Sequence, residues 1–96
     1  MAVYRITHFK VSPDAAAEMG ERRVALLASV RGRFSGLSEA RLAKIDEESW
    51  VDMWRWDSLE EAQAALAAVA TIPEAPAVFA LTKEPTAYFA EAVDER

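Results

Sequence analysis

The first residues of the chain follow the polar and apolar alternation of a β-strand. Residues 3–11, with the sequence VYRITHFKV, are rich in β-branched and aromatic side chains. Successive side chains of a strand point to opposite faces, so Arg5 and Phe9 should share one face. Tyr4 and His8 should then lie on the other face.

A helix is predicted to follow this strand. The sequence Ser-Pro-Asp at 12–14 supplies an N-cap, a proline suited to the first helical position and an early acidic residue. Helical periodicity continues to about Arg31. Gly32 and Gly36 mark the helix stop and the loop, and the pattern runs on past Gly32 to Phe34 if the last turn holds. The apolar stripe expected to face the sheet consists of Ala16, Met19, Leu26, Leu27 and Val30.

The middle of the chain predicts a hairpin and a second helix. Residues 37–45 and 49–57 have strand character and are separated by an acidic turn. Ser58 precedes Glu61 by three residues, which is the spacing of a capping box, and the helix should end near Ala70. The predicted apolar face of this helix consists of Leu59, Ala62, Leu66 and Val69.

The last third of the chain predicts one short helix and one strand. Pro73 and Pro76 stand at the head of the apolar segment 71–81, which suits a brief helix after a break. Residues 83–85 should break the chain again, and the alternating residues 86–93 indicate the final strand.

The order of these elements defines the expected fold. It is β, α, β, β, α, β with a small helical insert, the order of a ferredoxin-like α+β sandwich whose antiparallel sheet has the first and third strands at its centre. Both helices should pack on one face of the sheet, so the other face needs a cover, which is usually a second subunit. A homodimer is therefore expected.

Length and composition indicate one folded domain over 1–96. Hydrophobic residues make up 52% of the chain and charged residues 28%, as in ordinary globular proteins. The net charge of −5 argues against nucleic-acid binding, because affinity for phosphates depends on clustered basic residues. The sequence has no signal-peptide pattern and no apolar run of membrane-spanning length, so a cytoplasmic location is expected.

Several kinds of chemistry are excluded by missing residues. The chain has no cysteine, which removes disulfides, thiolate metal sites and cysteine nucleophiles. It also lacks a glycine-rich phosphate loop, a metal-ligand spacing and a serine elbow. The sequence thus predicts no metal and no cofactor.

His8 and Arg23 are the candidate catalytic residues. Imidazole titrates near neutral pH, so His8 could remove a proton from a phenol before oxygen attacks; alternatively, it is part of the core or of a dimer interface. Arg23 lies inside the apolar helix stripe, where its guanidinium could hold a carboxylate, phenolate or enolate of a ligand. The alternative for Arg23 is an ion pair with Asp52, and both hold if the pair lines a pocket.

Aromatic side chains are the candidate substrate-binding residues. Trp50, Trp54 and Trp56 share one strand face with Asp52, and they could stack against a planar polycyclic ligand. Their alternative is a packed core or a dimer interface. Tyr88, on the last strand, could supply a hydroxyl donor or could simply pack against its neighbours.

The segment WRWDSLEEAQAAL, an aromatic strand end followed by a capped, alanine-rich helix, is similar to a passage of the antibiotic biosynthesis monooxygenases. The resemblance covers essentially the whole chain in length and element order. It implies a dimeric α/β barrel, with a pocket between each sheet and its own helices in some members. Members of this wider group include cofactor-independent oxygenases, haem-degrading enzymes and proteins with no known activity.

The sequence departs from the characterised enzymes of that group in two respects. Both the quinone-forming oxygenases and the haem-degrading enzymes use an active-site asparagine, and this chain contains no asparagine. The segment 71–81 also lacks the axial histidine of the haem-degrading branch, which argues against haem degradation.

Two functions from different classes follow from the sequence. The first is a cofactor-independent monooxygenase that acts on an aromatic or polyketide-like small molecule. The second is a non-catalytic protein on the same dimeric scaffold, with a ligand-binding, structural or regulatory role, because a fold does not determine a function.

Overall fold

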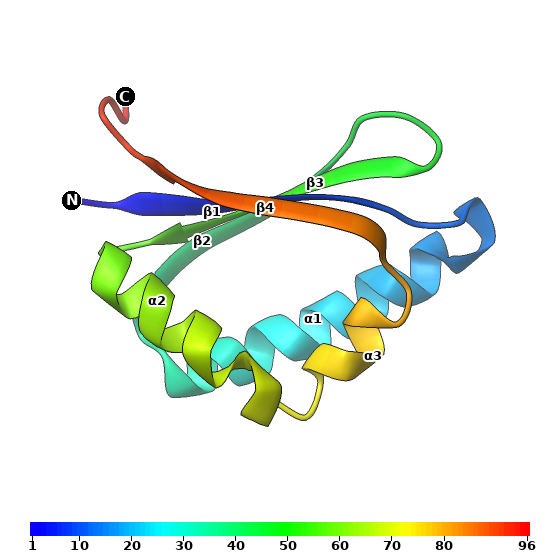
Figure 1. Ribbon diagram of the computed structural model, residues 1–96, viewed down its shortest axis with the longest axis horizontal. Helices are drawn as coiled ribbons and strands as arrows, with labels where there is room; N and C mark the ends of the chain where they lie inside the picture. Colours follow the sequence, from blue (N-terminus) through cyan, green and yellow to red (C-terminus); the bar gives the residue numbers. More distant parts are fainter.

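A computed structural model describes residues 1–96 and shows a four-stranded antiparallel sheet with helices on one side (Figure 1). The strand order is β2-β3-β1-β4, so the first and third strands are central, as predicted. The elements are β1 (Val3–Lys10), α1 (Ala16–Arg33), β2 (Leu37–Lys44), β3 (Ser49–Trp56), α2 (Leu59–Ala68), α3 (Ala75–Phe79) and β4 (Lys83–Glu91). This order confirms the predicted ferredoxin-like α+β fold.

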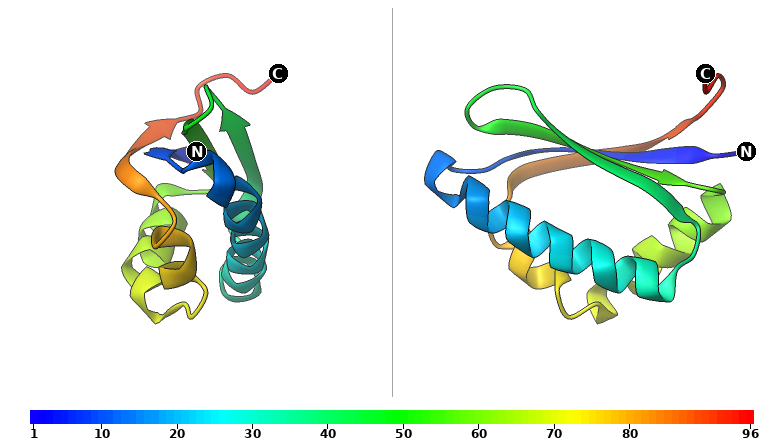
Figure 2. Two further views of the ribbon diagram at one scale, coloured as in Figure 1. Left: turned by 90° about the vertical axis from the view of Figure 1, so that its right-hand side faces the viewer. Right: turned by 180° about the vertical axis from the view of Figure 1, so that it is seen from behind.

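All of the helices cover the same face of the sheet. In Figure 2 the sheet forms one layer, and α1 lies beside the segments α2 and α3 in the other layer. The opposite face of the sheet carries no element of this chain. None of the helices combines the length and the apolar character that crossing a bilayer requires.

The first helix has the predicted buried stripe. Its buried residues are Met19, Leu26, Leu27 and Val30. The last turn of the helix holds past Gly32, which is the alternative that the sequence left open. The helix continues to Arg33, and the amide of Phe34 still donates to the carbonyl of Val30 at 2.8 Å. Gly32 has no positive φ here, so it acts as an ordinary helical residue.

The second helix begins where its cap predicts, but its buried face differs from the prediction. The amide of Glu61 donates to Ser58 Oγ at 3.2 Å, which confirms the cap. The buried residues are Ala62 and Ala65, whereas Leu59 and Leu66 are exposed. The prediction that Leu59 belongs to the buried face of this helix is therefore wrong.

The last strand starts earlier than predicted. Residues 83–85 were expected to break the chain, yet Lys83 pairs with Lys10 across the sheet. Between His8 and Lys10 the register shifts, and opposite this irregularity Glu84 has a φ of 51°. Pro85 lies on an edge strand, where a missing amide donor is tolerated.

The hydrophobic core fills the space between the sheet and the helices. The larger of two clusters has 11 buried residues, including Val3, Leu37, Trp56 and Ile72. A smaller cluster at the other end of α1 consists of Phe9, Val11 and Met19. These side chains lie between the sheet on one side and the helices on the other. The space between the two layers also holds a cavity.

Candidate functional site

A cavity of about 420 Å³ lies between the sheet and the helices. Strands β1, β3 and β4 form its floor, and the three helices form its walls. Of its 21 lining residues 15 are hydrophobic, so the transfer of an apolar molecule from water into this space would be favourable. Leu66 and Phe79 line it but are 44% and 54% exposed, which places them at its mouth.

An ion pair forms one polar corner of the cavity. Arg23 Nε donates to Asp52 Oδ2 at 2.8 Å, and Arg23 Nη2 donates to Asp52 Oδ1 at 2.8 Å. The two side chains are only 12% and 13% exposed. This two-bond geometry confirms the pairing predicted from the sequence, and both residues line the cavity.

Arg5 is a second charged residue of the cavity, and the sequence analysis did not single it out. It lies in the middle of β1, with Trp54 opposite it on β3 and Phe89 opposite it on β4. Its guanidinium carbon is 4.7 Å from the centroid of the Phe89 ring. The signal was available, because the strand alternation already put Arg5 on the face of the buried Phe9.

The tryptophans divide between two environments. Trp54 and Trp56 line the cavity, and Trp56 also meets the Phe34 ring edge-on, with 6.5 Å between the centroids. Trp50 lies on the same sheet face but packs against the smaller cluster that contains Phe9. Its buried Nε1 has no acceptor. The aromatic wall of the cavity therefore has two tryptophans and not the predicted three.

His8 and Tyr88 lie on the face of the sheet that has no helices. His8 Nε2 is 3.2 Å from the Tyr88 hydroxyl, and the two rings stack with 6.0 Å between their centroids. Because Arg5 and Asp52 belong to the opposite face, the thickness of the sheet separates His8 from the cavity. His8 and Tyr88 contact each other, but they lie on the opposite face of the sheet from Arg23. The predicted site residues therefore do not form one shared site.

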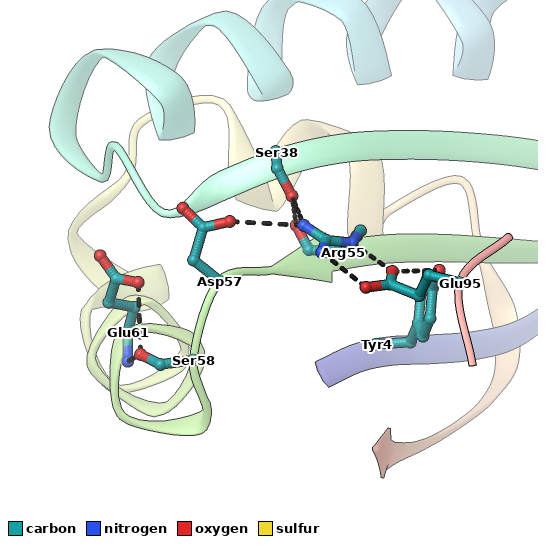
Figure 3. A network of polar contacts seen from close by, with 7 residues as sticks. All are labelled: Tyr4, Ser38, Arg55, Asp57, Ser58, Glu61 and Glu95. Atoms are coloured by element: carbon teal, nitrogen blue, oxygen red, sulfur yellow. Dashed lines mark hydrogen bonds and ion pairs between the residues drawn. The ribbon is translucent and has the colours of Figure 1, made fainter. Parts of the chain in front are cut away.

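A polar network at the end of this outer face holds the C-terminal tail (Figure 3). Arg55 donates to both carboxylate oxygens of Glu95, at 2.6 and 2.8 Å, and the Tyr4 hydroxyl donates to Glu95 at 3.2 Å. The hydrogen bond from Arg55 lowers the pKa of the Glu95 carboxyl, and the same contact raises the pKa of Arg55. Ser38 and Asp57 complete the contacts of the guanidinium.

The acidic turn between β2 and β3 is structural. Asp46 accepts hydrogen bonds from the amides of Glu48 and Ser49, at 3.0 and 2.8 Å, which lower the pKa of its carboxyl. No group of three or more histidine, aspartate or glutamate side chains is placed to hold a metal ion.

Comparison with solved structures shows which proteins share this fold. Antibiotic biosynthesis monooxygenases have the same arrangement of sheet and helices, as the sequence resemblance implied. A Caulobacter crescentus protein classed with these monooxygenases is 18% identical with a TM-score of 0.80, over 97% of this chain and 91% of its own. Searches by sequence match neither a protein-family model nor a curated protein.

Two further solved structures extend the comparison. SnoaB, a cofactor-independent oxygenase from Streptomyces nogalater, is 22% identical with a TM-score of 0.79, over 98% of this chain and 95% of its own. Rv0793 from Mycobacterium tuberculosis is also 22% identical, with a TM-score of 0.67 over 99% of this chain and 98% of its own. At these identities the likeness shows a shared fold.

Proposed function

We propose that this protein is a cofactor-independent monooxygenase of a planar aromatic small molecule. The observation that carries the proposal is the cavity of about 420 Å³, whose apolar walls meet a single, largely buried ion pair at one corner. Trp54 offers an aromatic surface for stacking, Trp56 is a buried part of the same wall, and Arg23 and Asp52 supply charge next to them. SnoaB, which shares the fold, is a cofactor-independent oxygenase.

The proposed reaction converts a ring CH₂ group of a hydroxylated polycycle to a carbonyl. The substrate carbon gives up two hydrogens and four electrons, one oxygen atom of O₂ enters the product and the other leaves as water. No external reductant is needed, because the substrate supplies all of the electrons. The reactive form of the substrate is its anion, so the site must accept a proton and stabilise negative charge.

Asp52 and Arg23 would perform these two tasks. Asp52 is the only carboxylate among the lining residues, so it is the proton acceptor in reach of a bound ring. Arg23 would keep Asp52 oriented through their two hydrogen bonds, and once Asp52 has taken the proton the charge of Arg23 would be free to stabilise the substrate anion. The apolar walls would keep water away from the anion, which strengthens its interaction with the guanidinium.

Oxygen uptake with 1,8-dihydroxyanthrone, a planar tricyclic phenol, tests the proposal. We expect uptake above the rate without protein, with one atom of ¹⁸O₂ in the product. Asp52→Asn should lower kcat roughly 100-fold or more, because it removes the proton acceptor. Arg41→Gln is the control, since Arg41 is exposed and outside the cavity. No uptake, or uptake that is unchanged in Asp52→Asn, would contradict the proposal.

One observation favours a non-catalytic binding protein as the second candidate. Both carboxylate oxygens of Asp52 are already engaged by Arg23, so the cavity has no free base. A protein that only binds an aromatic ligand does not need a free base. Saturable binding of 1,8-dihydroxyanthrone without oxygen uptake would support this candidate over the oxygenase.

A homodimer is part of the proposal. The outer face of the sheet carries apolar side chains from its central strands, including Ile6, Val51 and Met53, and Tyr88 is 49% exposed. A second copy that packs its own sheet against this face would bury these side chains.

A further inference from the structure

The charged groups that line the cavity do not cancel. Two guanidinium groups, from Arg5 and Arg23, and one carboxylate, from Asp52, leave a net charge of +1. Arg23 and Asp52 neutralise each other through their paired hydrogen bonds. The remaining positive charge therefore belongs to Arg5, in a chain whose overall net charge is −5.

Arg5 has no polar partner within the chain. It makes no ion pair and no side-chain hydrogen bond, and its one electrostatic contact is the face of the Phe89 ring at 4.7 Å. A ring face attracts the charge of a guanidinium but cannot accept its in-plane N–H donors. A half-buried guanidinium without an acceptor is costly to keep on the inner face of a central strand, where an apolar residue would pack at no such cost.

Arg5 lines the cavity among aromatic side chains. Trp54 and Phe89 are its cross-strand neighbours, and all three side chains line the cavity. An aromatic ring that stacks on this floor would bring a substituent at its edge next to the guanidinium. Two parallel N–H groups of arginine match the two oxygens of a carboxylate, and one of them suffices for a phenolate.

We propose that Arg5 is an anion-binding residue of the cavity and that the ligand is a planar apolar ring system bearing one ionised oxygen group, a carboxylate or a phenolate. This inference rests on the proposed function, since it names the substrate class of the same cavity. It adds a requirement that the apolar walls alone do not impose. A neutral ring of the same shape should bind more weakly.

A matched pair of ligands tests this inference. Anthracene-2-carboxylate and anthracene-2-carboxamide differ in charge but hardly in shape, and their fluorescence anisotropy reports binding. We expect the wild-type protein to bind the carboxylate about tenfold more tightly or better, as charge-assisted hydrogen bonds predict. Equal affinities for the two ligands would overturn the inference.

Substitution of Arg5 localises the preference. In Arg5→Gln the preference for the carboxylate should disappear, while Arg41→Gln, which removes the same charge from an exposed site, should retain it. If Arg5→Gln does not fold, Arg5→Lys is the test, because lysine keeps the charge but loses the two-donor geometry. The carboxylate should then bind more weakly to Arg5→Lys than to wild type. The affinity for the amide should be the same in both proteins. Carboxylate affinity that is unchanged in either folded variant would overturn the inference.

Oxygen uptake separates this inference from the proposed function. A carboxylate preference that depends on Arg5 in a protein that consumes no oxygen would support the anion site and contradict the oxygenase. Oxygen uptake with an unchanged KM for an ionised substrate in Arg5→Gln would support the oxygenase and contradict the anion site.

Discussion

Arg23 and Asp52 show, at the scale of single residues, how a counter-ion offsets the cost of placing a guanidinium in an apolar layer. Arg23 lies in the buried stripe of α1, and Asp52 reaches it from β3 with two hydrogen bonds of 2.8 Å. Removal of either partner would strand a buried charge, a defect that typically costs about 3–5 kcal/mol. The pair is therefore both a constraint on how α1 packs and the polar corner of the cavity.

The placement of His8 leads to the first prediction. Its imidazole faces away from the cavity and contacts Tyr88. Under the proposed function, His8→Ala should leave kcat for oxygen uptake within about threefold of wild type, whereas Asp52→Asn lowers it roughly 100-fold. Steady-state oxygen-electrode kinetics of the two variants make the comparison. A loss in His8→Ala as large as in Asp52→Asn would move the chemistry to the outer face of the sheet.

Individual residues were predictable to the extent that local periodicity determines them. The pairing of Arg23 with Asp52 followed from a charge inside an apolar stripe and one carboxylate on the facing strand. Alternation along residues 3–11 also placed Arg5 and His8 on opposite faces. Whether either face encloses a cavity depends on how far the helices stand from the sheet, and no local pattern contains that distance.

At the scale of elements, the start of α2 leads to the second prediction. Ser58 Oγ accepts the amide of Glu61, so Ser58→Ala leaves a helix donor without a protein partner. We expect the free energy of unfolding to fall by about 1 kcal/mol, as for other N-cap serines, when measured by urea denaturation. Ser35→Ala, in the exposed loop before β2, is the control and should change it little. Equal values for wild type and Ser58→Ala would contradict the capping role.

Elements with strong local signals were predicted better than those shaped by packing. The capping serine determines where α2 begins, but its buried face consists of Ala62 and Ala65. Small side chains let a helix approach a sheet closely. This tertiary effect, and not the spacing of Leu59 and Leu66, determines which face of α2 is buried. The start of β4 was missed for a similar reason, since Lys83 is recruited to the strand by pairing with Lys10 across an irregular register.

At the scale of the whole molecule, the uncovered sheet face leads to the third prediction. If two copies associate through this face, light scattering should give twice the chain mass of 10.6 kDa. Val51→Glu, on the outer face of a central strand, should shift the protein to the monomer because it places a charge in the interface. Val24→Glu is the matched control, since Val24 is 65% exposed on α1. A wild-type monomer, or a dimer that persists in Val51→Glu, would contradict this association.

The contact of Arg55 and Tyr4 with Glu95, here called the tail clamp, lies on the outer face of the sheet and leads to the fourth prediction. The bond from Arg55 lowers the pKa of the Glu95 carboxyl below its ordinary value of 4.5, so folding favours the ionised form. The clamp should therefore be fully formed above pH 4.5 and should be lost as the pH falls through the lowered pKa of the folded state. The Nε–H signal of Arg55 in a ¹H–¹⁵N NMR titration reports this opening.

Variants of the tail separate the clamp from general acid effects. Glu95→Gln should shift the Arg55 signal toward that of an unpaired arginine at neutral pH, whereas Glu91→Gln, at the end of β4, should leave it in place. An Arg55 signal that is identical in wild type and Glu95→Gln would show that the contact does not form in solution.

The residues at the mouth of the cavity and its charged residues come from different stretches of the chain. Leu66 and Phe79, at the mouth, belong to the helices after β3, whereas Arg5, Arg23 and Asp52 all precede them in sequence. Substitutions in the later stretch can therefore change which molecules are admitted without disturbing the groups that hold them. Evolution can alter substrate range and binding chemistry in this scaffold as two separate traits.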